Sequence, residues 1–296
     1  MELDHLEAFV AIVRQGGVTR AAAALHLSQP ALSRRLHLLE HEVGAPLFER
    51  IGRGFALTQA GRAFLPHAQA VLASMRDALD AVAALSDPTR GSVTLALVGT
   101  LASSHLTRSL QRFREQHPRI DLRLRTALSA EVSELVRSGD AALGLRYRAD
   151  SARDLVSRPV FEERMLVVCS PRFRLARSAH VSAKALADEP WIAFPRRPGR
   201  APEPYANALE QRLVANGLES ARIIPIDSLS AQKRMVEAGF GLALMPESSV
   251  VEELRAKTLC ALRAPSMRAN VPVMLVQRRH AYASAATKAL ATFLCE

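Results

Sequence analysis

The chain has 296 residues, 49% hydrophobic and 23% charged, which is ordinary for a globular protein and long enough for one large or two medium domains. No apolar run approaches the roughly 18–20 residues that span a bilayer, and the first ten residues carry three acids in place of a positive secretory start, so we expect a cytoplasmic protein without a membrane segment. The net charge of +10 favours a polyanionic partner such as a nucleic acid, although a solvated basic surface would give the same balance.

Two short amphipathic helices are predicted at the start of the chain. The spacing that puts apolar side chains on one helix face occurs in Leu6, Phe9, Val10 and Val13, and again in Val18, Ala21, Ala22 and Leu25. Gly16-Gly17 should end the first helix and separate it from the second. The alanines from Ala21 to Ala24 favour a helix and have little bulk, so the two helices can cross closely.

A third helix is predicted after a four-residue turn, His26 to Gln29. Ser28 is a suitable N-cap, and Pro30 stands in the first turn, where its missing N–H costs nothing. The apolar stripe of this helix is Leu32, Leu36, Leu39 and Val43, and away from it point Pro30, Ser33, Arg34 and His37, with Gln29 at the flank. The exposed half therefore presents an amide, a hydroxyl and a guanidinium, which can hydrogen-bond base edges in a major groove and the flanking phosphates.

A β-hairpin should follow the third helix. Pro46–Arg50 and Phe55–Leu57 bracket a turn with Arg53 at its tip, where an arginine can reach phosphates or a narrow minor groove. We interpret residues 1–58 as a winged helix-turn-helix that binds double-stranded DNA. Three helices and a hairpin used for protein contacts would give the same pattern. The segment has six arginines and six acidic residues, so its net charge does not distinguish DNA binding from protein binding. The candidate DNA-binding residues are Arg20, Ser28, Gln29, Pro30, Ser33, Arg34, Arg50 and Arg53.

These motifs together resemble the LysR-type transcriptional regulators of bacteria. The shared pattern comprises Ala21-Ala22, Leu25, Leu27–Arg34, Leu38-Leu39-Glu40, Gly44–Arg50, Leu57-Thr58 and Gly61. The resemblance implies a winged helix, a linker helix and a two-lobed effector domain like a type 2 periplasmic binding protein, usually assembled as a tetramer. Gly17 departs from the pattern, because the family often has a serine there that caps the second helix, but glycine costs only a few tenths of a kcal/mol at such a position.

A long linker helix is predicted from Thr58 to about Leu85. Its apolar residues are spaced alternately four and three, as in a coiled coil: Phe64, Ala68, Val71, Met75, Ala78, Val82 and Leu85. An isolated helix with one apolar stripe would be unstable in water, so we expect residues 59–88 to pair with a second copy through Phe64, Ala68, Val71, Met75 and Val82. Packing of the stripe on the chain's own domain is the alternative. Pro66 should leave one carbonyl unpaired and bend the helix.

The pattern changes in residues 89–296, which we interpret as an α/β effector-binding domain. Strands are expected around Val93–Leu97, Ile120–Leu124, Ala141–Leu145, Met165–Cys169, Trp191–Phe194, Arg222–Ile226, Leu242–Met245 and Val271–Gln277. Helices are expected at about Ser104–Gln116, Ala130–Ser138, Pro204–Asn216, Ser228–Ala238 and Tyr282–Leu294. This alternation predicts largely parallel pairing. Two lobes are expected, with lobe I at about 89–161 and 268–296 and lobe II at about 162–267. The segments of this region most similar to the LysR-type family are Val236–Pro246 and Gly91–Leu95.

Ligands of open α/β sheets bind beyond the carboxyl ends of strands, and polar groups follow several of the predicted strands. The positions match those that line the effector cleft of LysR-type regulators, and the candidates are Thr100, Leu101, Ser103, Ser104, Ser129, Arg146, Phe194, Arg196, Arg197 and Asp227. Because guanidinium groups bind carboxylates bidentately, Arg146, Arg196 and Arg197 favour a small organic anion as effector. Surface exposure or ion pairs within the chain would explain the same arginines.

Other classes of protein fit the sequence less well. The chain lacks Gly-x-Ser-x-Gly, His-Glu-x-x-His and a phosphate-binding loop, and Gly239-Phe240-Gly241 is only half of a dinucleotide fingerprint, so we expect no enzyme. Cys169, Cys260, Cys295 and the nine histidines show no ligand or redox spacing, so we expect reduced thiols, no metal and no cofactor. A solute-binding protein would not need a winged helix, and an architectural DNA binder would not need two lobes.

The sequence therefore predicts a sequence-specific DNA-binding transcription regulator controlled by a small-molecule effector. Its expected partners are double-stranded DNA, an anionic effector and further copies of itself in a homodimer and a homotetramer. RNA polymerase is a further candidate partner.

Overall fold

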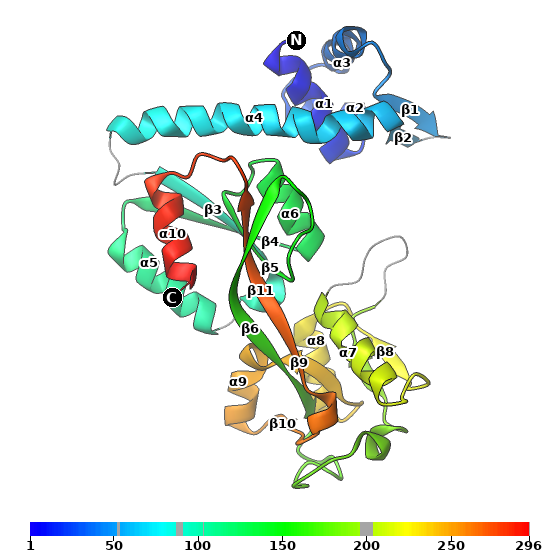
Figure 1. Ribbon diagram of the computed structural model, residues 1–296. Coiled ribbons are helices and arrows are strands. Elements are labelled where there is room, and N and C mark those ends of the chain that lie inside the picture. Colours follow the sequence, from blue (N-terminus) through cyan, green and yellow to red (C-terminus); the bar gives the residue numbers. More distant parts are fainter. Residues whose placement is uncertain (52–53, 87–90, 103, 196–203, 296) are drawn as a thin grey trace.

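The computed structural model describes residues 1–51, 54–86, 91–102, 104–195 and 204–295. Figure 1 shows a small N-terminal domain at the top, one long helix beneath it, and two lobes below that helix. Within the described ranges no helix combines the length and the apolar character that crossing a membrane requires.

The N-terminal domain contains three helices and a hairpin, as predicted. The elements are α1 (Leu3–Gln15), α2 (Val18–Ala24), α3 (Gln29–Val43), β1 (Phe48–Ile51) and β2 (Gly54–Leu57), and the two strands pair antiparallel. The predicted apolar faces of the three helices meet in one buried cluster. The ring of Phe9 lies at its centre, with ring centroids 5.4 Å from Phe48 of the hairpin and 5.6 Å from Phe64 of the next helix.

Three residues of the LysR-like motif hold the hairpin against the helices. Glu40 of α3 accepts a hydrogen bond of 2.8 Å from the N–H of Leu47 through Oε1. Thr58 donates its hydroxyl to the carbonyl of Pro46 over 2.7 Å and accepts the N–H of Gly61 at 2.9 Å, so it caps the following helix. Gly61 has no room for a side chain, because a Cβ there would lie 2.1 Å from the carbonyl oxygen of Leu47.

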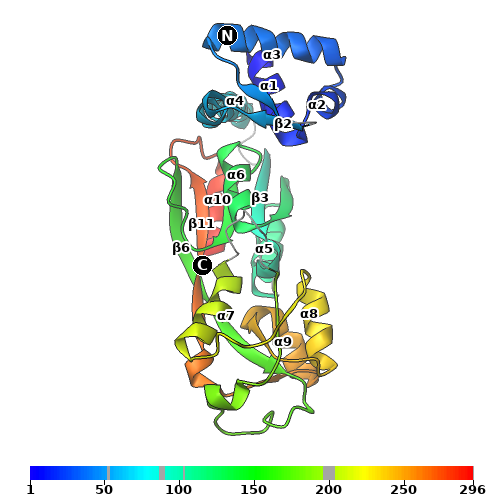
Figure 2. The same ribbon diagram turned by 90° about the vertical axis from the view of Figure 1, so that its right-hand side faces the viewer.

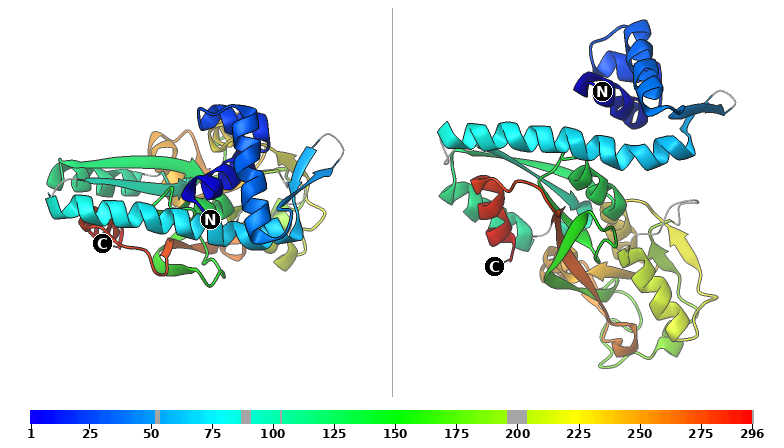
Figure 3. Two further views of the ribbon diagram at one scale, coloured as in Figure 1. Left: turned by 90° about the horizontal axis from the view of Figure 1, so that it is seen from above. Right: turned by 45° about the horizontal axis from the view of Figure 1, so that its top comes forward.

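The linker helix α4 (Gln59–Ser86) continues through Pro66 as one element. Figure 3 shows α1–α3 on one side of α4 and lobe I on the other, and Figure 2 views α4 along its axis between them. The single helix therefore joins the N-terminal domain to the two lobes.

The remaining elements are β3 (Gly91–Val98), η1 (Gly99–Leu101), α5 (Ser104–Gln116), β4 (Ile120–Ala127), α6 (Ser129–Arg137), β5 (Leu143–Tyr147), β6 (Leu155–Cys169), η2 (Ala183–Leu186), β7 (Trp191–Ala193), α7 (Pro204–Ala215), β8 (Ile223–Pro225), α8 (Leu229–Glu237), β9 (Ala243–Pro246), α9 (Glu247–Ala256), β10 (Cys260–Ala261), η3 (Pro265–Met267), β11 (Ala269–Arg278) and α10 (Ala285–Cys295). Helix α9 and strand β10 were not predicted, and β6 begins at Leu155 instead of Met165.

The main sheet is mixed, so the prediction of largely parallel pairing is wrong. Its strand order is β10-β6-β11-β5-β3-β4, with β9 also paired to β6. Parallel pairs join β3 to β4 and β3 to β5, and β7 to β8 in a separate two-stranded sheet. β11 runs antiparallel to β5 and β6, and β9 and β10 run antiparallel to β6. The chain crosses between the lobes in opposite directions along β6 and β11, so these two strands must oppose each other.

The strands β6 and β11 form a two-stranded bridge between the lobes (Figure 1). Lobe I contains β3–β5 with α5, α6 and α10, and lobe II contains β7–β10 with α7–α9. The register of the bridge shifts between Val273 and Met274, which marks a β-bulge near its middle. A bulge bends a strand and increases its local twist, so the bridge is bent near its middle.

Candidate nucleic-acid interface and ligand cleft

Helix α3 turns its leucines inward and its polar N-terminal half outward. Leu32, Leu36 and Leu39 are buried in the domain core. Gln29 and Arg34 are exposed at the start of the helix, beside Ser28 and Pro30, which are also exposed, while Ser33 is half-buried. Ser28 accepts the N–H of Ala31 at 3.3 Å and so caps the helix. The predicted amide and guanidinium thus stand on one open surface.

Two neighbouring arginines of α3 have different surroundings. Arg35 forms an ion pair of 2.6 Å with Asp4 of α1. Arg34 is exposed and makes no hydrogen bond or ion pair within the described residues. Arg20 of α2 is exposed and donates to the carbonyl of Gly16 over 3.1 Å. Arg53 and the side chain of Arg50 lie outside the described part of the chain.

The apolar stripe of α4 divides into two parts. Phe64 and Ala68 pack into the core of the N-terminal domain, as in the alternative of packing within the chain. Further along, large apolar side chains are exposed, with fractions of 48% for Val71, 44% for Met75, 60% for Leu79 and 65% for Val82. Only the second part, from Val71 onward, is therefore open to a partner.

Ion pairs attach lobe I to α4 and α1. Asp140, in the turn after α6, accepts Arg14 of α1 at 2.6 Å and lies 3.7 Å from Arg76 of α4. Arg278, at the end of β11, pairs with Asp77 of α4 at 2.7 Å. We call this set of contacts the linker joint. It connects the effector-binding part to both the linker helix and the helix-turn-helix.

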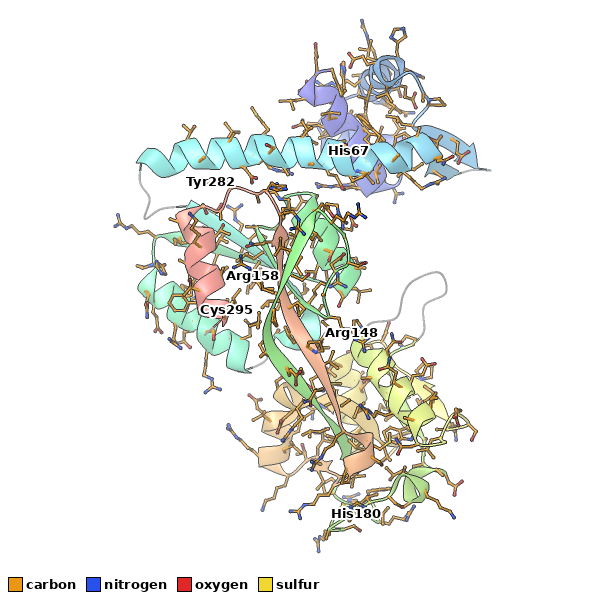
Figure 4. All side chains as sticks on the ribbon, viewed as in Figure 1. His67, Arg148, Arg158, His180, Tyr282 and Cys295 are labelled. Atoms are coloured by element: carbon orange, nitrogen blue, oxygen red, sulfur yellow. The ribbon has the colours of Figure 1, made fainter. Side chains whose placement is uncertain are left out.

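The linker joint is closely packed as well as charged. Gly139 has a φ of 73°, and a Cβ there would lie 2.8 Å from the Cβ of Ala73 in α4. The backbone N–H of Tyr282 also donates to Asp77 over 3.3 Å, and Figure 4 shows Tyr282 directly beneath α4. Glycine at position 139 therefore allows the backbones of α4 and lobe I to approach each other.

A cavity of about 480 Å³ lies between the two lobes. Lobe I contributes the carboxyl ends of β3 and β4 with the start of η1, and lobe II contributes Phe194 after β7 and one face each of α8 and α9. The polar groups in its wall are Thr100, Ser230, Lys233, Ser248, Ser249, Glu252 and Glu253. The cleft thus forms where ligands of α/β sheets are expected.

Internal contacts hold the polar wall of the cleft. The ammonium of Lys233 lies 2.5 Å from Glu253 and donates to the carbonyl of Ser249 over 3.1 Å. The hydroxyl of Thr100 lies 3.0 Å from that of the buried Tyr147. The carboxylate of the buried Glu163 accepts both the N–H and the hydroxyl of Ser248, at 3.2 and 2.8 Å, and so fastens the start of α9 to β6. Lys233 of α8 is thus bonded to α9, and both helices contribute residues to the cavity wall.

The structure brings some of the predicted cleft residues together and places others elsewhere. Thr100 and Phe194 line the cavity, whereas the side chains of Leu101 and Ser129 are buried and Asp227 is exposed beyond the cavity wall. Ser103, Arg196, Arg197 and the side chain of Ser104 lie outside the described residues.

Arg146 stands inside β5 and not after it, and it is not among the residues that line the cavity. It donates to Ser133 over 2.5 Å and pairs with Asp150. Burial by itself would raise the pKa of Asp150, but hydrogen bonds from Ser133 and Ala152 and the charge of Arg146 outweigh burial and leave this pKa lowered. The guanidinium of Arg146 therefore serves an internal ion pair.

Sequence reasoning missed Lys233 and the whole contribution of α9. A signal for α9 was present, because the polar run Glu247-Ser248-Ser249 follows the predicted strand Leu242–Met245 with only Pro246 between them. The same strand-end argument that selected Thr100 would have selected this segment.

Two family models match the chain. The model described as bacterial regulatory helix-turn-helix protein, lysR family, matches residues 3–62, and the LysR substrate binding domain matches residues 86–296. The chain belongs to the LysR family of transcriptional regulators. This family consists of transcription regulators and not of enzymes, so the protein is a DNA-binding transcriptional regulator with an effector-binding domain.

Curated relatives agree with this LysR assignment. The chain is 31% identical to the HTH-type transcriptional regulator CfxR of Cupriavidus necator over 255 residues, which cover 86% of this chain and 78% of the relative. It is 30% identical to the HTH-type transcriptional regulator BudR of Raoultella terrigena, with 92% of this chain and 94% of the relative covered.

Solved full-length structures share the fold from end to end. A full-length variant of OxyR from Pseudomonas aeruginosa superposes with a TM-score of 0.75 at 19% identity, covering 99% of this LysR-type chain and 94% of the other. Full-length CbnR in complex with its target DNA superposes with a TM-score of 0.64 at 23% identity, covering 99% of both chains.

Proposed function

We propose that α3 enters the major groove of an operator and that Gln29, Ser33 and Arg34 contact base edges there. The observation that carries this proposal is that the N-terminal half of α3 exposes its polar side chains while the leucines of the same helix are buried in the domain core. Ser28 and Pro30 stand next to these residues in the chain, and we propose that they and Arg20 of α2 position α3 on the DNA backbone. Arg50 and Arg53 of the wing are proposed to contact phosphates or the minor groove. The DNA complex of CbnR, a protein of the same fold, supports this role.

Two adjacent arginines provide the test of the DNA interface. A DNA site is first selected from a random library by the wild-type protein, and gel-shift affinities are then measured on this site and on its single-base variants. Arg34→Ala should weaken binding about 5- to 150-fold and reduce discrimination at one or two positions, because a bidentate contact to a base is worth about 1–3 kcal/mol. Arg35→Ala, which removes the pair with Asp4, should keep the base preferences. Unchanged affinity and preferences in Arg34→Ala would contradict the assignment.

We also propose that the protein acts as a homodimer through the exposed part of α4 from Val71 to Val82. Four large apolar side chains on one helix would be stabilised by burial against a second copy. A dimer presents two α3 helices to two half-sites about one or more DNA turns apart. Assembly of dimers into a tetramer, contact with RNA polymerase and a cytoplasmic location remain predictions.

For the effector we propose a small organic anion in the cavity between the lobes. Its volume, about 480 Å³, lies within the roughly 300–1,000 Å³ typical of small-molecule sites. Lys233 supplies a cation in the wall, and the hydroxyls of Thr100 and Ser230 supply donors. A ligand carboxylate can replace Glu253 as the partner of Lys233. Arg196 and Arg197 follow Phe194 in the chain and are proposed to add to this charge.

Matched pairs of compounds test the charge of the effector. Calorimetry is done with benzoate against benzamide and with succinate against succinamide, on the wild type and on two variants. We expect binding of a carboxylate and not of its amide, and a loss of at least tenfold in Lys233→Gln. Lys288→Gln, an exposed lysine on α10, should behave as the wild type. Binding of the amides alone, or equal carboxylate affinity in Lys233→Gln, would refute an anionic effector held by Lys233.

The proposed response couples lobe closure to the linker. A ligand that contacts both lobes binds the closed arrangement more tightly and shifts the population toward it. The β6–β11 bridge takes up the change of angle, and the linker joint passes it to α4 and α1. The spacing of the two α3 helices, or the bend of the DNA, then changes. Footprints that are identical with and without a bound effector would contradict this coupling.

A further inference from the structure

Two of the three cysteines lie opposite each other at the outer edge of lobe II. Strand β10 runs antiparallel to the end of β6, and the register puts Cys260 directly across from Cys169. Both side chains pack against the same hydrophobic cluster, so they project from the same face of the sheet. The fold therefore makes neighbours of two thiols that are far apart in the sequence.

The spacing of such a pair suits a covalent bond. Opposite residues of antiparallel strands have Cα atoms about 4.5–5.5 Å apart, which lies within the roughly 4.4–6.8 Å that a disulfide spans. Strand β10 has only two residues and is the terminal strand of the sheet, so a small shift of its backbone can bring the sulfurs together. We propose that Cys169 and Cys260 form a reversible disulfide that responds to low-molecular-weight disulfides such as oxidised glutathione.

The order of the reaction follows from the surroundings of the two sulfurs. Cys169 is fully buried and Cys260 is half-buried. Burial, with a smaller contribution from the neighbouring Cys260, raises the pKa of the Cys169 thiol to about 12. The Cys260 thiolate therefore attacks the small disulfide first, forms a mixed disulfide and releases one thiol. Cys169 then attacks the sulfur of Cys260, gives up its proton and releases the second thiol, so two protein thiols and one disulfide give one protein disulfide and two small thiols.

The bond would close a loop that contains most of lobe II. Residues 170–259 include β7, β8 and β9 with α7, α8 and α9, and thus the two helices that line the ligand cleft. Joining the ends of so long a segment restricts the unfolded chain and stabilises the folded lobe. It also fixes β10, which follows α9 after a short turn, to β6. An effect on effector affinity rests on the proposed function, whereas formation of the bond does not.

Peptide mapping tests the pair directly. The full-length protein is equilibrated in mixtures of reduced and oxidised glutathione, alkylated with iodoacetamide and digested with trypsin without reduction. We expect peptide 165–172 linked to peptide 258–263 in the oxidising mixtures, and free alkylated peptides after return to reduced glutathione. Cys295 is an internal control, because it lies on α10 in the other lobe (Figure 4). Absence of the linked peptides, or linkage to Cys295 instead, would overturn the proposal.

Thermal unfolding of variants gives an independent readout. Oxidation should raise the melting temperature of the wild type by about 5 °C, given the stabilisation typical of a disulfide in a domain of this size. Cys295→Ser should show the same rise, and Cys260→Ser should show none, each variant being compared with its own reduced form. Equal shifts in the wild type and Cys260→Ser would refute a bond at this position. Neither measurement needs DNA or an effector, so failure here is distinguishable from failure of the proposed function.

Discussion

Replacing Gly139 by alanine tests whether lobe I packs on α4 in solution as it does in the structure. The φ of 73° at this position costs an L-residue about 1–2 kcal/mol. The added Cβ would also lie 2.8 Å from the Cβ and 3.2 Å from the Cα of Ala73, and such overpacking typically costs about 1–3 kcal/mol. The total is about 2–5 kcal/mol if α4 stays in place. The pairs of the exposed Arg14 and Arg76 with Asp140 are worth at most about 1 kcal/mol each, whereas the Arg278–Asp77 pair is largely buried. We therefore expect α4 to move away from the turn at Gly139 while the contact at Asp77 is kept.

The control variants carry the backbone strain without the collision. Gly217 and Gly239 have φ values of 68° and 86°, and a Cβ at either position would meet nothing within 4 Å. Gly139→Ala should therefore lower the free energy of unfolding by about 1–3 kcal/mol more than Gly217→Ala or Gly239→Ala. Hydrogen exchange should become faster in α4 around Ala73, and the second substitution Ala73→Gly should recover part of the difference. Equal stability losses in all three glycine variants, with unchanged exchange in α4, would show that lobe I and α4 do not pack together in this way.

Two further predictions concern the N-terminal domain and the dimer. Gly61→Ala should lower the stability of the winged helix by about 1–3 kcal/mol, although alanine is the better helix former, because the new Cβ would lie 2.1 Å from the carbonyl oxygen of Leu47. Gly17→Ser, which has open space around it, should raise the stability by a few tenths of a kcal/mol. If calorimetry finds a gain in stability for both variants, the packing at Gly61 is contradicted. Met75→Glu combined with Val82→Glu puts charges on the exposed apolar side chains of α4, so sedimentation should show monomers in place of the proposed dimer. Substitution of the exposed Ser74 by glutamate should leave the dimer intact. A dimer that survives the double substitution would not use this face of α4.

Residues whose environment is set by their near neighbours in sequence were predictable. The face of α3 followed from helical spacing, a cap at Ser28 and a proline at the first turn, all within one short segment. The carboxyl-end rule found Thr100 and Phe194 because their strands end close to where the pattern predicted. It failed for Arg146, because β5 ends at Tyr147, and the arginine lies within the strand and pairs with Asp150.

Contacts set by the tertiary structure left little trace in the sequence. Heptad spacing in α4 marked an apolar stripe but could not say that Phe64 and Ala68 face the chain's own domain while Val71 and Met75 remain exposed. The pairing of Cys169 with Cys260 depends on β10, a strand of two residues without any pattern of its own. Lys233 lines the cleft with its ammonium reaching from α8 to Glu253 of α9, a contact between two segments that no local pattern connects.

Strand β3 extends from the space beneath α4 to the ligand cleft, so it links the two places where we expect a change on ligand binding. Its first half lines the space beneath α4 with Ser92 and Thr94, and its last residue, Val98, begins a part of the cleft wall that continues with Gly99 and Thr100 of η1. Hydrogen bonds to β4 and β5 hold it on both sides, so it cannot slide within lobe I without breaking the sheet. The linker joint, in contrast, consists of a few ion pairs, the hydrogen bond from Tyr282 to Asp77 and one close glycine contact, and rearranging these contacts costs less than breaking a sheet.

Lobe I should therefore move as one body, and ligand-driven change should appear at its boundaries. On one side the boundary is the β6–β11 bridge with its bulge. On the other side it is Asp140, which contacts Arg14 of the helix-turn-helix and Arg76 of α4 together. A rotation of lobe I that alters these two pairs would change the position of lobe I relative to α1 and α4, which are packed together through Phe9 and Phe64. Because α1, α3 and the start of α4 share one core, we expect them to move together, so that the proposed coupling would act on the angle between this unit and lobe I.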